Sequence, residues 1–152
     1  MKYIEVETEQ AIPAFATELN KGAPVFVLFH MDGCGHCIAM RPEWQKLRTV
    51  GQSLGAPVVI AEVNQKLLTP LSNKLSNSKI KNNIANISGF PSIKYIKGDT
   101  IVDYDGDRTI DRFMKWIRSR STIKGGRRGR RSRSRRRRRS KSRQRSTFRR
   151  RR

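Results

Sequence analysis

The sequence predicts a single α/β domain, with helices packed on a central mixed β-sheet, joined to a separate basic segment. Apolar runs rich in β-branched and aromatic residues alternate with stretches whose apolar residues recur every three or four positions, which is typical of buried strands between amphipathic helices. Residues 124–152 contain 16 arginines and two lysines but no acidic residue, so they hold 18 of the chain's 34 basic side chains. We therefore expect a folded domain over residues 1–123 and a disordered tail over residues 124–152.

Four elements are expected in the first half of the domain. The run VFVLF is apolar throughout and predicts a strand that is covered on both faces. The apolar spacing after it predicts a helix that Pro42 should kink, and the spacing before it predicts a helix with Thr8 as the N-cap. A short strand precedes both helices. The expected ranges are 3–6 and 25–29 for the strands and 9–19 and 37–50 for the helices.

The second half of the domain is expected to complete the sheet. Residues 57–63, PVVIAEV, predict a second buried strand, and residues 92–104 predict a hairpin whose turn is Gly98-Asp99. An amphipathic helix over residues 108–119 closes the domain. Residues 65–88 are rich in asparagine, serine and lysine, and we expect a loop and an irregular helix there.

The only two cysteines of the chain lie in the sequence GCGHC, residues 33–37, between a predicted strand and a predicted helix. Such a pair could supply half of a zinc site, form a structural disulfide, or exchange electrons as a dithiol. A zinc site needs four ligands, and the other soft ligands in the chain are His30 and His36. A structural disulfide would close a ring too small to stabilise the fold much. We favour the dithiol, with both alternatives open.

The position of the pair favours redox chemistry. Unpaired backbone N–H groups and the positive end of a helix dipole favour a thiolate at Cys34, and the thiolate is the reactive form. We expect Cys34 to attack a disulfide in a partner protein and Cys37 to resolve the mixed disulfide. Gly35 and His36 lie between the cysteines, and a histidine there can stabilise the thiolate by charge and hydrogen bonding.

Four motifs in order, GCGHC, RPEW, GFPSIKYI and YDGDRTIDRFMKWI, make residues 1–120 similar to a thioredoxin-fold domain of the protein disulfide isomerase type. The resemblance implies a thioredoxin-like fold, protein dithiols or disulfides as substrates, and no cofactor beyond a redox-active Cys34–Cys37 disulfide. It implies that Cys34 is the exposed nucleophile and Cys37 the buried resolving thiol. It also implies a cis bond before Pro91, where a substrate strand pairs with the backbone, and an arginine, Arg108, that lowers the pKa of the resolving thiol.

Three positions depart from the pattern of this family. Gly33 replaces a tryptophan before the first cysteine, Leu28 replaces a buried acid, and Glu62 replaces a lysine on the next strand. We expect Glu62, half-buried beneath the dithiol, to accept the proton of Cys37. If Glu62 faces solvent instead, water takes that role. Arg108 could equally be a solvated charge.

The tail is too basic and too poor in apolar residues to bury a core, because its like charges repel. Arginine side chains form bidentate hydrogen bonds with phosphates and release counterions from a polyanion. We therefore expect nucleic-acid binding without base specificity. A nuclear import signal and attraction to acidic membrane surfaces are further interpretations. The arginines expected to bind nucleic acid are Arg127, Arg128, Arg130, Arg131, Arg135, Arg136, Arg137, Arg138 and Arg139.

No apolar run in the sequence is long enough for a signal peptide or a membrane span. We expect a monomer inside the cell, in the cytosol or nucleus, and an arginine-rich arm would also suit packaging in a virus particle. Two hypotheses for function follow. The first is a thiol-disulfide oxidoreductase that forms, reduces or isomerises protein disulfides and binds a polyanion through its tail. The second is a nucleic-acid-binding or virion-packaged protein that keeps the domain as a redox-inactive scaffold.

Overall fold

A computed structural model of the chain describes residues 1–121. The predicted tail, its arginines and the predicted domain boundary at residue 123 lie outside the described residues. A five-stranded mixed sheet runs in the order β1-β3-β2-β4-β5. β1 and β2 both run parallel to β3, whereas β4 is antiparallel to β2 and β5 is antiparallel to β4. The strands are β1 Lys2–Val6, β2 Val25–His30, β3 Val59–Asn64, β4 Ser92–Lys97 and β5 Thr100–Asp103.

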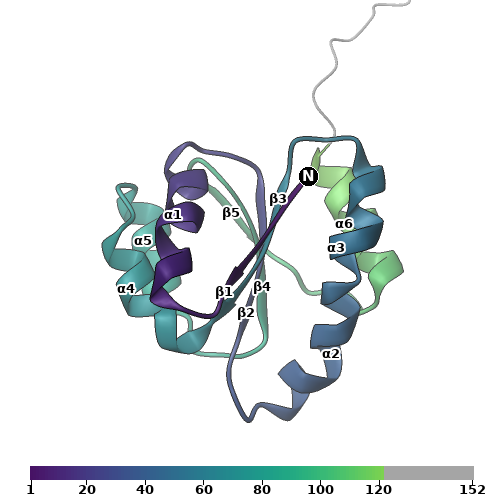
Figure 1. Cartoon of the computed structure of the whole chain (residues 1–152), viewed down its shortest axis with the longest axis horizontal. Coiled ribbons are helices and arrows are strands. Elements are labelled where there is room, and N and C mark those ends of the chain that lie inside the picture. Colours follow the sequence, from purple (N-terminus) through teal and green to yellow (C-terminus); the bar gives the residue numbers. More distant parts are fainter. Residues whose placement is uncertain (122–152) are drawn as a thin grey trace, which may run out of the picture.

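Helices cover both faces of this sheet. α1, α4 and α5 lie on one face, and α2, α3 and α6 lie on the other (Figure 1). The helices are α1 Ile12–Asn20, α2 Gly35–Gln45, α3 Leu47–Val50, α4 Leu68–Asn73, α5 Ser78–Ala85 and α6 Ile110–Ser121. Among residues 1–121, no helix is both long and apolar enough to cross a membrane. This three-layer arrangement confirms the predicted α/β fold with a mixed sheet.

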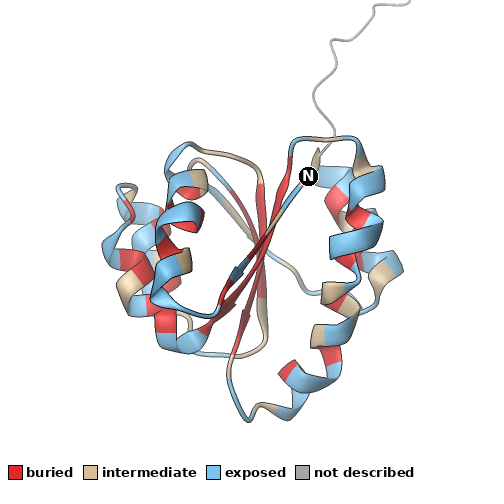
Figure 2. Ribbon diagram, viewed as in Figure 1, coloured by how far each residue is buried: buried red, intermediate tan, exposed pale blue. Residues whose placement is uncertain are grey.

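The strands β2 and β3 form the centre of the core, since every residue in them is buried. The continuous apolar run VFVLF therefore packs against helices on both sides, as predicted. The side chains of the sheet alternate between two apolar clusters. Figure 2 shows the buried residues along the strands and on the flanking helices. Phe15 of α1 anchors one cluster, and Trp44 of α2 anchors the other, where its ring lies edge-on to Phe113 with the centroids 5.1 Å apart.

Two helix boundaries differ from the prediction. The helix expected over residues 37–50 is two helices, with Lys46 between α2 and α3. Pro42 lies inside α2 and has no N–H to donate to the Ile38 carbonyl one turn before it, whereas the Lys46 N–H still donates to the Pro42 carbonyl. Thr8 precedes a 3-10 turn instead of α1, and its side chain makes no capping hydrogen bond. α1 begins one turn later because Pro13 is preorganised for the first turn of a helix.

The asparagine-rich segment is more regular than expected. Residues 65–88 contain the two helices α4 and α5. The side chain of Asn77 accepts hydrogen bonds from the backbone N–H groups of Lys79 and Ile80, so asparagine acts as a helix cap here. Ile80 and Ile84 are four residues apart and both are buried against the sheet. The hairpin between β4 and β5 is confirmed, with Gly98 at φ +54° in its turn.

Candidate active site

The two cysteines lie where β2 is followed by α2. β2 ends at His30, a short connection follows, and Cys34 is the N-cap of α2. The Cys34 Sγ accepts a hydrogen bond from the backbone N–H of Cys37 at 3.2 Å. A sulfur therefore takes the place of the side-chain oxygen that commonly caps a helix. Both thiols are free, so the structure presents the dithiol form, with Cys34 at the positive end of α2.

Gly33 has a conformation that explains why tryptophan is absent before the first cysteine. Its φ is +73°, in the left-handed region, where a residue with a Cβ is strained. An added Cβ would meet no other atom within 4 Å. The backbone conformation, and not crowding, therefore favours glycine at this position.

The two thiols differ in exposure and in pKa. Cys37 is 2 % exposed, whereas Cys34 is half-buried. A hydrogen bond from the Cys37 thiol lowers the pKa of Cys34, and the backbone N–H groups of Cys37 and His36 and the charge of Arg108 act in the same direction. Burial raises the pKa of Cys37, and its hydrogen bond to Cys34 raises it further. Cys34 is thus the thiol that ionises first, which is the order that nucleophilic attack by Cys34 requires.

Iodoacetamide is expected to alkylate Cys34 well before Cys37. Because the pKa of Cys34 is lowered, the midpoint at which its thiolate fraction and its alkylation rate rise should lie at a lower pH than for a free cysteine. Cys37 should react only at higher pH or after unfolding, since its pKa is raised and its side chain is buried. Mass spectrometry of the digested protein across a pH series measures both rates. Equal rates for the two thiols would contradict this assignment.

The loop before β4 and the connection after β5 both approach the cysteines. The Phe90–Pro91 bond is cis, as the resemblance implied, and the Cys34 thiol donates to the Phe90 carbonyl oxygen with a separation of 3.7 Å. Arg108 is exposed, and its charge lowers the pKa of both thiols. Gly35 and His36 are exposed in the first turn of α2. The fold therefore gathers all these predicted residues around the dithiol.

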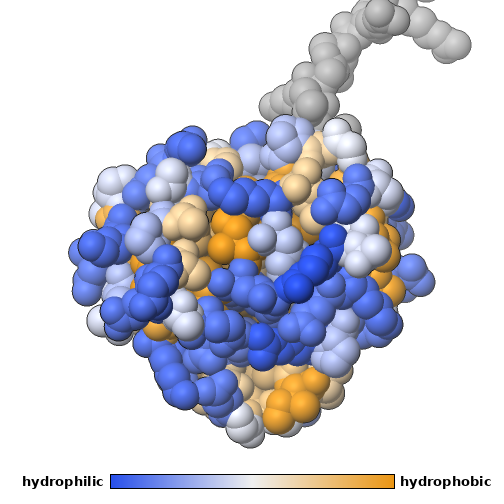
Figure 3. Space-filling view, in the orientation of Figure 1, coloured by the Kyte–Doolittle hydropathy of each residue, from blue (hydrophilic) through white to orange (hydrophobic). Residues whose placement is uncertain are grey.

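An apolar surface also lies beside the dithiol. Ile38 follows Cys37 in α2 and is 64 % exposed. Figure 3 shows apolar atoms exposed at the end of the molecule where α2 begins. Exposed apolar surface of this kind suits contact with another protein.

Glu62 is fully buried, whereas the sequence predicted a half-buried side chain. Its carboxylate accepts hydrogen bonds from Arg41 Nε at 2.8 Å, Gln45 Nε2 at 3.2 Å and the Tyr3 hydroxyl at 3.4 Å. Arg41 and Gln45 belong to α2, so the carboxylate lies between the sheet and the helix that carries the cysteines. Burial raises the pKa of Tyr3, and the charge of Glu62 adds to this, which keeps the hydroxyl a donor. Proton transfer from Cys37 to Glu62 stays a prediction.

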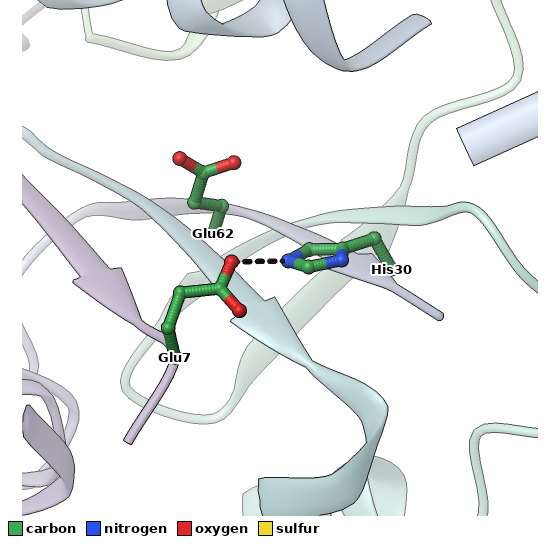
Figure 4. A group of neighbouring side chains, drawn as sticks. All are labelled: Glu7, His30 and Glu62. Atoms are coloured by element: carbon green, nitrogen blue, oxygen red, sulfur yellow. Dashed lines mark ion pairs between the residues drawn. The ribbon is translucent and has the colours of Figure 1, made fainter. Parts of the chain in front are cut away.

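A second carboxylate is linked to Glu62 through Arg41. Glu7 Oε1 lies 3.1 Å from His30 Nε2, and Arg41 forms ion pairs with both Glu7 and Glu62. Figure 4 shows the Glu7–His30 pair with Glu62 beside it; Glu7 follows β1, His30 ends β2 and Glu62 lies in β3. The guanidinium of Arg41 supplies the positive charge that these two carboxylates need. Burial lowers the pKa of His30. Neither cysteine belongs to this group, which gives the zinc alternative no support among the described residues.

Arg41 is the residue of this region that sequence reasoning missed. Arg41 lies four residues after Cys37, and Gln45 lies four residues after Arg41. This spacing places all three on one side of a helix. A buried acid on the strand beneath this side of α2 needs a cation. The pairing of Arg41 with Glu62 could therefore have been predicted once Glu62 was assigned to the core.

Residues 5–119 match the family model for thioredoxin, and this chain belongs to the thioredoxin family. With its Cys34–Cys37 pair, its domain is of the protein disulfide isomerase type, as the following relatives show. It is 29% identical over 109 residues to a protein disulfide-isomerase of Ricinus communis, matching 70% of this chain and 20% of that protein. It is 32% identical over 104 residues to protein disulfide-isomerase 1 of Dictyostelium discoideum, matching 68% of this chain and 26% of that protein. The chain therefore spans only a minor part of the length of these relatives.

Solved structures give the same fold. The solution structure of the first thioredoxin domain of mouse protein disulfide-isomerase A4 superposes with a TM-score of 0.54 and 25% sequence identity, covering 80% of this chain and 77% of that chain. The J-Trx1 fragment of ERdj5 superposes with a TM-score of 0.56 at 21% identity, covering 78% of this chain and 50% of that chain. The predicted thioredoxin-like fold is thus confirmed.

Proposed function

We propose that this chain is a thiol-disulfide oxidoreductase that acts on protein disulfides through Cys34 and Cys37. The observation that carries the proposal is that the Cys34 sulfur caps α2. This places a thiol of lowered pKa at the N-terminus of the helix. Cys34 is partly exposed and so can meet a partner, whereas Cys37, three residues away, is buried. This arrangement separates the attacking thiol from the resolving thiol.

The proposed reaction transfers two electrons. The Cys34 thiolate attacks one sulfur of a substrate disulfide, so a Cys34–substrate disulfide forms and the other substrate sulfur leaves as a thiolate. Cys37 then loses its proton, and its thiolate attacks Cys34 Sγ. The Cys34–Cys37 disulfide forms, the second substrate thiolate leaves, and the substrate has been reduced. The reverse sequence oxidises a substrate dithiol.

Reduction of insulin by dithiothreitol, with the full chain as catalyst, tests this proposal. We expect turnover by the full chain and none above background by a Cys34→Ser variant, because serine cannot form the mixed disulfide. Recovery of activity from scrambled ribonuclease tests isomerisation in the same way. Equal rates for the full chain and for Cys34→Ser would favour the second hypothesis, in which the domain is a redox-inactive scaffold.

We propose further that Glu62 accepts the proton that Cys37 loses during resolution. A Glu62→Gln variant should slow resolution by about 10²-fold while changing the first attack little, since general-base assistance is lost only in the second step. Rapid quenching followed by mass spectrometry separates the two steps, and a parallel urea titration checks that the variant is folded. A resolution rate and pH profile unchanged from wild type would remove Glu62 from the mechanism.

We also propose that residues 124–152 bind a polyanion such as nucleic acid. The support is compositional: these residues carry 18 of the chain's positive charges, whereas the net charge of +22 leaves only about +4 for the first 123 residues. Base selectivity should be slight, because arginine contacts to phosphate carry no sequence information.

Deleting residues 124–152 is expected to abolish nucleic-acid binding while leaving insulin reduction within about twofold, because a charged tail adds little to a packed core. Binding by the full chain should weaken by about 10³-fold or more between 50 and 200 mM salt if six or more phosphates are engaged. Electrophoretic mobility shifts over a salt series, run on both proteins, measure this. Binding retained by residues 1–123 would place the polyanion site on the domain.

A further inference from the structure

A polar groove of about 790 Å³ lies beside the cis-proline loop. Three parts of the chain line it: one side of α5, residues 87–91, and the adjoining ends of β4 and β5. Nine of its fourteen lining residues have charged, amide or hydroxyl side chains, so the groove suits a polar occupant. Its volume falls in the range of about 300–1,000 Å³ typical of ligand sites.

We propose that this groove binds an acidic side chain of the substrate segment whose disulfide Cys34 attacks. The inference rests on the proposed oxidoreductase function and adds a substrate preference to it. The preferred substrate carries aspartate or glutamate within a few residues of its reactive cysteine, in an extended stretch of chain.

The wall formed by α5 faces the groove with its polar side. Ile80 and Ile84 are buried on the core side of this helix. Lys79, Asn82 and Asn86 are exposed and line the groove at spacings of three and four residues, which makes one continuous stripe. The ammonium of Lys79 and the amide N–H groups of the asparagines can donate hydrogen bonds to a carboxylate.

The strand side of the groove holds a second lysine. Lys94 lies in β4 and is 7 % exposed, and its ammonium pairs with Asp103 of β5, whose side chain is mostly exposed. An ammonium has three N–H donors, and Asp103 is the one acceptor found for it among residues 1–121. A buried ammonium is costly unless it is well paired, so a second acceptor would stabilise it. With Lys79 included, the groove has two cations and one anion.

The groove is continuous with the dithiol through Phe90 and Pro91, which line it, and the Phe90 carbonyl lies 3.7 Å from Cys34 Sγ. Residues 88–90 make no backbone–backbone hydrogen bond within the described part of the chain, so their backbone can pair with an extended segment. Along such a segment, alternate side chains point the same way, with a rise of about 3.3 Å per residue. A side chain two or four residues from the substrate cysteine can therefore enter the groove.

Peptide mixed disulfides test this preference with the full chain. Three heptapeptides have a central cysteine joined to 2-mercaptoethanol and differ only in carrying glutamate, leucine or lysine two residues to either side. We expect kcat/KM for reduction to be about tenfold higher for the glutamate peptide than for the lysine peptide, as one charged hydrogen bond can provide. Lys79→Glu should bring this ratio close to one. Lys81→Glu makes the same charge change on the same helix outside the groove and should leave the ratio unchanged.

The neutral hydroxyethyl disulfide separates failure of this inference from failure of the proposed function. Wild type, Lys79→Glu and Lys81→Glu should all reduce it at similar rates, which also shows that the variants are folded. The basic tail is present in all three proteins, so any attraction of the tail for acidic peptides cancels in the comparison. Fastest reduction of the leucine peptide, or the same glutamate-to-lysine ratio in wild type and Lys79→Glu, would overturn the inference. Absence of turnover with hydroxyethyl disulfide would overturn the oxidoreductase function, and this inference with it.

Discussion

A Cys37→Ala variant is expected to accumulate stable mixed disulfides between Cys34 and its substrates. Cys37 is the one other cysteine of the chain, and its thiol hydrogen-bonds to Cys34. An intramolecular thiol held this close acts at a very high effective concentration, so its loss should lengthen the lifetime of the mixed disulfide by about 10³-fold or more. Non-reducing electrophoresis and peptide mass spectrometry after incubation with oxidised insulin measure the adduct.

The matched control for this experiment is Cys34→Ala, which keeps only the buried thiol of raised pKa. It should form no adduct under conditions in which Cys37→Ala is fully trapped. Adducts of equal yield through either cysteine would mean that the two thiols are interchangeable, and the assignment of attacking and resolving roles would then be wrong.

An Arg41→Met variant is expected to lose about 3 kcal/mol of its free energy of unfolding, the lower end of the cost of breaking a buried ion pair. Arg41 bridges Glu7 and Glu62, and its removal leaves the Glu62 carboxylate fully buried without its cation. Methionine keeps much of the apolar length of the side chain, so most of the loss should be electrostatic. Urea unfolding at neutral pH measures it.

Lys66→Met is the control for this variant, because Lys66 forms an exposed pair with Asp32. Its loss should cost at most about 1 kcal/mol. The double variant Arg41→Met with Glu62→Met should recover most of the stability, because a buried pair can often be replaced by apolar side chains. A loss for Arg41→Met no larger than that for Lys66→Met would show that solvent, and not Arg41, compensates the Glu62 charge.

The elements that the sequence predicted best are those whose pattern reports burial directly. The run VFVLF became β2, buried at every residue, and the hairpin turn at Gly98 was found where the glycine allows a positive φ. The asparagine-rich residues 65–88 were harder to interpret because asparagine disfavours helix interiors. Here Asn77 caps α5, and the helix gains its stability from the burial of Ile80 and Ile84.

The residues of the candidate site that belong to one contiguous motif were predictable from the sequence. Those that only tertiary packing brings together were harder to predict. Cys34 and Cys37 follow from GCGHC and its place before a helix. The sequence drew attention to Glu62, but its buried partners on α2 depend on how that helix crosses β3. The groove beside Pro91 likewise depends on the position of α5, which no local pattern specifies.

The reduction potential of the Cys34–Cys37 pair tests the central claim most directly. The full chain would be equilibrated with glutathione redox buffers, quenched with acid, and its disulfide content measured by mass spectrometry. We predict one two-electron transition that joins Cys34 to Cys37, at a potential between about −270 and about −180 mV, the span from thioredoxin to protein disulfide isomerase. A pair that stays reduced throughout, or one that remains oxidised at potentials below about −300 mV like a structural disulfide, would contradict the account.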